Sequence, residues 1–392
     1  MILNDRRRPG LPAELVGRVF AIWLAVVVLH LAVVAIAGSP STTPPILGLP
    51  MLVSALTLGC TMLLIGRIAF RVLDEEIAGL ACLASAMAVP LLVAMWPAMP
   101  AMPAMTGVHG LQAVCILFAL NGLLAREARY GGWAIGAALA SALALSLDGM
   151  VLALGFVAVA ALKWLRNRAE RWWLVHTLQA LTVVAAGVLA ARWAMGQPAG
   201  CGSLGVAHLV AFAWASGIVT VVALFEPHPR AFTLGGMVAA AGGAGLLLSD
   251  WTTGCAIGPM LGLTGTEPLW RGGAIFAIQA LGLPLLGLSA ALRLKSSARD
   301  WLGRWWSDYA LILVLATIVA ACDARVAAAA CALAAVPIGW QMREWIRAAR
   351  HSRRIGRRAL ALTGVALALA PALPISLLVL AAPTYAGDLI GG

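Results

Sequence analysis

Long apolar runs alternate with short polar segments along almost the whole chain. A membrane-spanning helix needs about 20 apolar residues, because the hydrocarbon core of a bilayer is roughly 30 Å thick and a helix rises about 1.5 Å per residue. Nine runs have the length of one crossing. They predict spanning helices near 17–38, 46–66, 77–95, 108–125, 174–194, 205–225, 231–248, 272–292 and 359–382.

Two further runs, 133–162 and 309–342, are too long for one crossing, with 30 and 34 residues. Basic residues flank both ends of each run, and basic residues favour the cytoplasmic side of a membrane. Each run should therefore be a helical hairpin, broken at Asp148-Gly149 in the first and at 323–325 in the second. Half of the first run spans only about 22 Å. Its tip should thus end inside the membrane, where other helices or a wet cavity must cover the backbone.

The predicted fold is an all-α, polytopic transmembrane bundle of about 13 helices (range 11–13). The N-terminus would be cytoplasmic and the C-terminus periplasmic. We expect one integral membrane domain over 1–392, with a basic cytoplasmic segment at 1–16 and a short periplasmic tail at 383–392. This topology places 24 of the 27 basic residues in the cytoplasm. The exceptions are Arg192, Arg271 and Arg325.

Composition supports this interpretation, because 62% of the residues are hydrophobic and only 11% are charged. A water-soluble domain carries roughly 25% charged residues, so a soluble fold is excluded. The net charge of +11 then indicates orientation in the membrane, and no nucleic-acid partner is expected. The seven cysteines show no metal-binding spacing, and we predict no metal site and no evident cofactor. Cys201 and Cys255 fall in predicted outer loops, where a disulfide between them is one alternative.

Three residues are candidates for acid–base chemistry: Asp148, His109 and Asp250. An ionisable residue at membrane depth often lines a polar site, although Asp148 could instead only cap the helix that follows it. His109 begins a span, where a structural hydrogen bond is the alternative role. Asp323 and Arg325 sit at the second break and are expected to form a structural pair.

A second group of candidates, Arg192, Trp270 and Arg271, lies in the predicted outer loops. A guanidinium group grips a phosphate with two parallel hydrogen bonds. The candidate ligands are therefore a polyprenyl phosphate or a phospholipid of the outer leaflet. The alternative is that both arginines only extend to lipid headgroups without binding a specific ligand.

The stretch from about Gly66 to Gln279 resembles bacterial polytopic proteins related to GT-C glycosyltransferases, which are similar to the catalytic subunit of oligosaccharyltransferase. Three segments carry the likeness: GVHGLQ (107–112), ALALSLDGM (142–150) and CAIGPMLGLTGTEPLW (255–270). The resemblance implies the use of a polyprenyl-phosphate-linked sugar at the periplasmic face of the bacterial inner membrane. The matching residues are His109, Gln112, Cys255, Gly258, Pro259 and Trp270.

The chain also departs from that family. The acidic residue of the family's first outer loop has no counterpart in SPSTTPPI (39–46), and Val108 stands where an Asp is expected. Whether the chain is an enzyme therefore stays open. The alternatives are a GT-C-like transferase that is either active or catalytically degenerate, a non-catalytic subunit bound to other membrane proteins, and a transporter.

Overall fold

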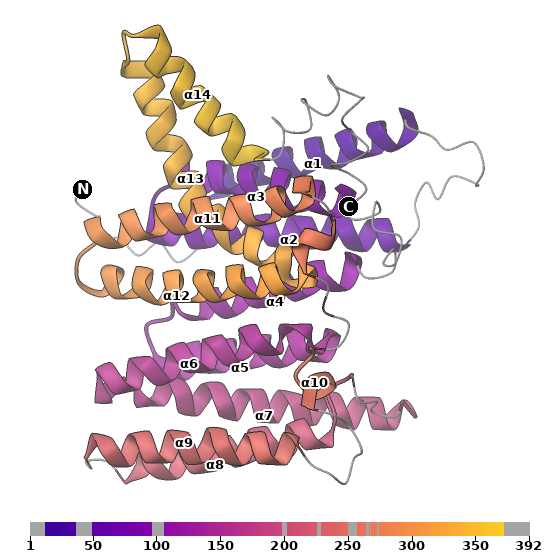
Figure 1. The fold of residues 1–392 in the computed structure, drawn as a ribbon, viewed down its shortest axis with the longest axis vertical. Coiled ribbons are helices and arrows are strands. Elements are labelled where there is room, and N and C mark those ends of the chain that lie inside the picture. The colour runs from indigo at the N-terminus through magenta and orange to yellow at the C-terminus, as the bar shows by residue number, and fades with distance from the viewer. Residues whose placement is uncertain are drawn as a thin grey trace. The chain divides into compact units, whose positions relative to one another are not determined.

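A computed structural model describes residues 12–36, 49–95, 106–197, 202–225, 229–249, 257–263, 266, 268–272 and 274–371. All regular elements in these ranges are helices (Figure 1), which confirms the all-α prediction. Eight of the helices are long and apolar enough to cross a membrane, so the chain has the make-up of a multi-pass membrane protein. The α-helices are α1 (Ala13–Ile36), α2 (Leu49–Val72), α3 (Glu75–Met95), α4 (Thr106–Gly122), α5 (Ala128–Leu145), α6 (Met150–Arg166), α7 (Arg171–Ala194), α8 (Val206–Leu224), α9 (Arg230–Leu248), α10 (Ile257–Met260), α11 (Ala274–Ser297), α12 (Asp300–Cys322), α13 (Ala327–His351) and α14 (Ile355–Leu369).

The helices form two compact units. Unit 1 contains α1–α3, α11, α13, α14 and most of α12. Its central helix is α13, because 89% of the most apolar stretch of this helix is buried. Unit 2 contains α5–α10, most of α4 and residues 314–319 of α12. Within unit 2, α7 packs against α5, α6 and α8, and α8 packs against α9.

Glycines bring α5 and α7 into backbone contact in unit 2. A Cβ atom added to Gly136 would lie 2.7 Å from the Cβ of Ala180 and would also collide with the carbonyl oxygen of Thr177. Gly131, one turn earlier on α5, faces the Trp173 ring near the start of α7. The two helices therefore run parallel. Small residues commonly permit such close approach between membrane helices.

Replacing Gly136 with alanine should lower the free energy of unfolding by about 1–3 kcal/mol, because the added methyl group has no room. Gly187 on α7 is a matched control, since a Cβ there meets nothing within 4 Å. Thermal unfolding of the purified protein in detergent would compare Gly136→Ala with Gly187→Ala. Equal melting temperatures for the two variants would contradict the close contact.

Both predicted helix breaks are present. Since α5 and α7 are parallel, α6, which joins the end of α5 to the start of α7, must run back along them (Figure 1). At the second break, α13 also runs back along α12, because the hydroxyl of Tyr309 on α12 donates a hydrogen bond to the carbonyl of Leu333 on α13. Both helix pairs extend past the apolar runs that predicted them. The helices of the second pair, α12 and α13, have 23 and 25 residues, and those of the first pair, α5 and α6, have 18 and 17.

The same local motif begins a new helix at three of the helix junctions. An extended residue, Ser146, Asn167 or Asp323, accepts a hydrogen bond in its side chain from the main-chain N–H two residues later. A single 3-10 turn follows each one and leads directly into α6, α7 or α13. Short polar side chains favour such helix starts because they satisfy N–H groups that have no partner within the helix.

Candidate functional site

Three segments that are remote in sequence meet at the first helix break, all of them in unit 2. Gln112 of α4 is only 4% exposed, and its Nε2 donates a 3.0 Å hydrogen bond to the carbonyl of Ser146. Gly149 lies directly against the Gln112 amide, which leaves no space for a larger residue. The loop that follows α10 covers the break from another side. A Cβ at Gly262 would lie 2.8 Å from the main-chain nitrogen of Asp148.

Gly262 has a positive φ of +71°. A residue with a Cβ rarely adopts this conformation, and here it would also collide with the carbonyl of Leu147. The loop after α10 can therefore approach the break only with glycine at this position. This contact joins the segment that contains Gly258 and Pro259 to the segment that contains Asp148.

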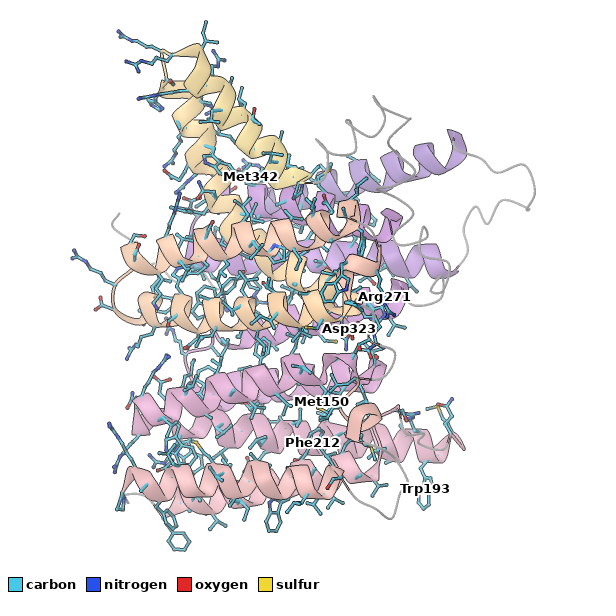
Figure 2. The ribbon with its side chains drawn as sticks, in the orientation of Figure 1. Met150, Trp193, Phe212, Arg271, Asp323 and Met342 are labelled. Atoms are coloured by element: carbon cyan, nitrogen blue, oxygen red, sulfur yellow. The ribbon has the colours of Figure 1, made fainter. Side chains whose placement is uncertain are left out.

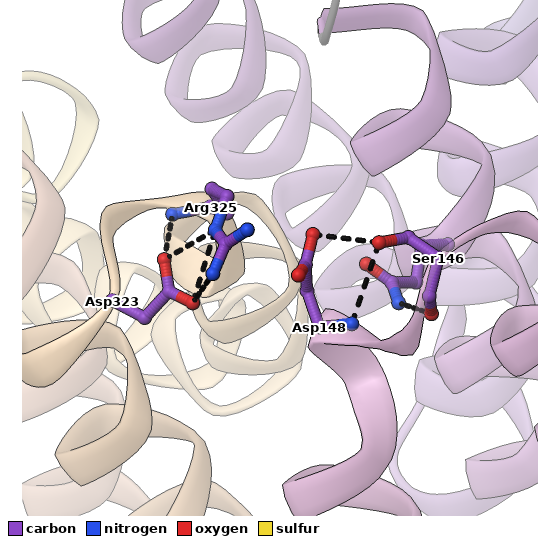
Figure 3. A network of polar contacts seen from close by, with 5 residues as sticks. Ser146, Asp148, Asp323 and Arg325 are labelled. Carbon is purple, nitrogen blue, oxygen red and sulfur yellow. Dashed lines mark hydrogen bonds and ion pairs between the residues drawn. The ribbon is translucent and has the colours of Figure 1, made fainter. Parts of the chain in front are cut away.

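Asp148 is half-buried, and its carboxylate is oriented by Ser146. The Ser146 hydroxyl donates a 2.6 Å hydrogen bond to Oδ2 of Asp148 and accepts the main-chain N–H of Asp148 at 3.3 Å (Figure 3). Ser146 is thus the residue that caps the new turn. The N-cap of α6 is Gly149, which has no side chain of its own to cap the helix.

His208 fixes α10 in place. Its Nδ1 accepts the main-chain N–H of Gly205 at 3.2 Å, so the ring proton must sit on Nε2, which contacts the carbonyl of Met260 at 2.8 Å. The side chain is fully buried and binds as the neutral tautomer. The sequence shows only a histidine three residues after a glycine at a helix start, a spacing that suits a capping box. The contact of His208 with the carbonyl of Met260 could not be predicted from the neighbouring sequence, because the two residues are 52 positions apart.

The second break, in unit 1, carries the predicted structural pair. Arg325 donates from Nε to Oδ1 of Asp323 at 2.9 Å and from Nη2 to Oδ2 at 2.7 Å, and both side chains are 7% exposed (Figure 3). Asp323 also accepts the main-chain N–H of Arg325 at 3.1 Å. The carboxylate at this break therefore both caps the turn and is neutralised by a neighbouring guanidinium. At the first break a serine hydroxyl caps the turn instead, and the Asp148 carboxylate accepts a hydrogen bond from that serine.

The other predicted site residues are distributed over both units. His109 is buried in the first turn of α4 and groups with unit 1. Trp270 and Arg271 are exposed neighbours on a 3-10 turn of unit 1. Arg192 belongs to unit 2, on the last turn of α7. Asp250, Cys201 and Cys255, and with them the disulfide alternative, fall outside the described residues.

The position of Arg192 follows from the parallel packing of α5 and α7. The end of α7 lies at the same end of unit 2 as the end of α5, where the break begins. Arg192 is half-buried there, and its neighbour Trp193 is 87% exposed and projects away from the helices (Figure 2). This end of unit 2 therefore combines a carboxylate, a guanidinium and an exposed indole, and indole rings are enriched at membrane interfaces.

An acidic cluster in unit 1 was not recognised in the sequence. Asp74 accepts the main-chain N–H of Ile77 at 2.9 Å and so caps α3, and it also forms an ion pair with Arg343 of α13. Glu76 lies 3.5 Å from Arg347. Three consecutive acidic residues (74–76) in a chain with only 16 acidic residues were the available signal. They tie the α2–α3 turn to α13.

Among the residues that the structure describes, no three His, Cys, Asp or Glu side chains are grouped so that they could hold a metal ion. Comparison with protein-family models, curated proteins and solved structures gives no match. The case for a function therefore depends on the arrangement of the residues themselves.

Proposed function

We propose that this protein is a GT-C-like integral membrane protein of the bacterial inner membrane that handles a polyprenyl-phosphate-linked sugar at the periplasmic face. One observation carries the proposal. Gly262 of segment 255–270 and Gln112 of segment 107–112 both contact the first break, which lies in segment 142–150. These segments are separated by up to about 150 residues in the chain, and nothing in the resemblance itself required them to meet.

The residues at this end of unit 2 fit the chemistry of glycosyl transfer. That reaction needs a base for the acceptor and positive charge to stabilise the departing phosphate. Asp148 has a half-buried carboxylate that the Ser146 hydroxyl orients, and Arg192 provides a guanidinium at the same end of the unit. We assign acid–base chemistry to Asp148 and phosphate binding to Arg192. His109 and Asp250 remain further acid–base candidates, and Arg271 and Trp270 remain further candidates for binding the lipid phosphate.

Sugar transfer or hydrolysis should be measured in sealed membrane vesicles supplied with a radiolabelled polyprenyl-phosphate sugar. Vesicles that contain the protein should consume the substrate faster than vesicles prepared without it. Purified protein should also bind the polyprenyl phosphate without the sugar. A protein that neither consumes the lipid-linked sugar nor binds the lipid phosphate would contradict the proposal.

A non-catalytic membrane subunit is the second candidate function, and α9 is the observation that favours it. Only 11% of the most apolar stretch of α9 is buried. Its open face carries the small residues Ala231, Gly235, Gly242 and Gly245, with Val238 between the two pairs, and small residues let another helix pack closely. Purification in mild detergent should then yield a stoichiometric partner chain, and Gly242→Leu should remove it. A monomer in the mildest detergent would exclude this function.

A further inference from the structure

Five arginines lie where α13 ends and α14 begins in unit 1: Arg350, Arg353, Arg354, Arg357 and Arg358, here called the arginine tip. All five are exposed. The chain has no acidic residue between Glu344 and Asp388. The tip is therefore a concentrated positive patch that its own stretch of sequence does not balance.

The nearest acidic residues are already engaged with other arginines. Arg343 forms an ion pair with Asp74, and Arg347 lies within 4.0 Å of both Glu76 and Glu344. Within the described part of the chain, none of the five tip arginines forms an ion pair. The acidic α2–α3 turn therefore neutralises the base of the α13–α14 hairpin and leaves its tip positive.

The charges at the tip oppose the local helical structure. Arg357 and Arg358 lie in the first turn of α14, where the helix dipole disfavours positive charge. No side chain caps the start of that helix. Negative charge supplied from outside the chain would relieve both effects.

Exposed apolar residues accompany the arginines. Ile355 at the tip is 86% exposed and Leu360 on α14 is 75% exposed. The hairpin itself is packed, because Gly364 of α14 leaves only 3.1 Å between an added Cβ and the Trp345 ring of α13. Arginines beside exposed aliphatic residues, next to an apolar helix long enough to cross a membrane, match the boundary between headgroups and acyl chains.

We infer that the arginine tip binds the phosphate groups of anionic phospholipids in the leaflet beside it. Guanidinium groups contact the phosphates, while Ile355 and Leu360 insert among the acyl chains. Polybasic segments next to a spanning helix bind anionic lipid in this way, with about 1 kcal/mol for each basic residue near the surface. The arginine tip shares no residue with the Asp148 site, so the inference does not depend on the proposed function.

Native mass spectrometry of the full-length protein in a neutral detergent tests the inference. Phosphatidylglycerol and phosphatidylcholine with identical acyl chains would be titrated separately. The wild-type protein should bind phosphatidylglycerol at least about tenfold more tightly. This preference should fall as salt increases, and R353Q/R354Q/R357Q/R358Q should abolish it. Equal binding of the two lipids, or a preference that salt does not change, would overturn the inference.

A matched control removes four exposed basic residues from the α11–α12 region, as R293Q/K295Q/R299Q/R304Q. It changes the net charge by the same amount and should keep most of the preference. An equal loss in both variants would reduce the effect to overall charge and overturn the assignment. Tighter binding of an oligonucleotide to the tip, in competition with phosphatidylglycerol, would also overturn it.

If the fourfold variant does not fold, R357Q/R358Q should show a smaller loss of the preference for phosphatidylglycerol. An unchanged preference in this double variant would overturn the inference.

Discussion

Asparagine in place of Asp148 is expected to lower the turnover of a polyprenyl-phosphate-linked sugar by about 10²–10⁴-fold, the usual contribution of a positioned acid or base. Asparagine has the same shape as aspartate and still accepts the hydrogen bond that Ser146 donates to Oδ2. The main-chain N–H of residue 148 still reaches the Ser146 hydroxyl. The variant therefore removes the charge and the base while the turn stays intact. Initial rates in vesicles, normalised to the amount of protein, measure the effect.

Ser146→Ala is the control for Asp148→Asn, because it removes the cap and leaves the carboxylate. It should lower the free energy of unfolding by about 1 kcal/mol, as the loss of an N-cap side chain usually does. Its turnover should fall less than that of Asp148→Asn. Full turnover in Asp148→Asn, in a preparation whose wild-type protein is active, would exclude Asp148 as the acid–base residue.

Methionine in place of Arg325 should lower the free energy of unfolding by about 3–5 kcal/mol. Removing one partner of a buried ion pair leaves the other charge uncompensated, and the Asp323 side chain is only 7% exposed. Asparagine at position 323 can still cap the turn, because its side-chain oxygen accepts the main-chain N–H of residue 325. The double variant Asp323→Asn/Arg325→Met should therefore be more stable than Arg325→Met alone.

Thermal unfolding of the wild-type, single and double variants in one detergent measures this coupling. The double variant should recover a large part of the lost melting temperature, because neither charge is left buried without its partner. A double variant that is less stable than Arg325→Met would show that the carboxylate of Asp323 stabilises the break on its own. That result would contradict the role of the pair described above.

The features that could be predicted from the sequence are those that depend on the lengths of the apolar runs and on the charged residues in and beside them. Polar residues in the middle of two overlong apolar runs located both breaks, and basic residues at both ends of 133–162 predicted that α6 runs back along α5. The same reasoning paired Asp323 with Arg325, which are two residues apart. Helix ends were less accurate: α12 begins at Asp300 rather than near 309, because its first turns are polar but continue the same helix.

The remaining features depend on contacts between distant segments, and no local pattern reveals them. The Ser146 hydroxyl accepts the main-chain N–H of Asp148, a contact that depends on the backbone geometry at the break. Gly262 is required only because the Leu147 carbonyl lies against it. His208 is positioned by a carbonyl 52 residues away. The sequence could identify the residues of the candidate site but not the arrangement that unites them.

The placement of the Asp148 end of unit 2 on the outer side of the membrane is the central claim, and cysteine labelling in intact spheroplasts tests it most directly. A cysteine-free form of the chain would carry one new cysteine, either at exposed Gln197, next to the end of α7, or at exposed Arg168, in the turn before α7. The account predicts that a membrane-impermeant maleimide labels position 197 in intact cells and position 168 only after permeabilisation. Labelling of position 168 from outside, with position 197 protected, would contradict it.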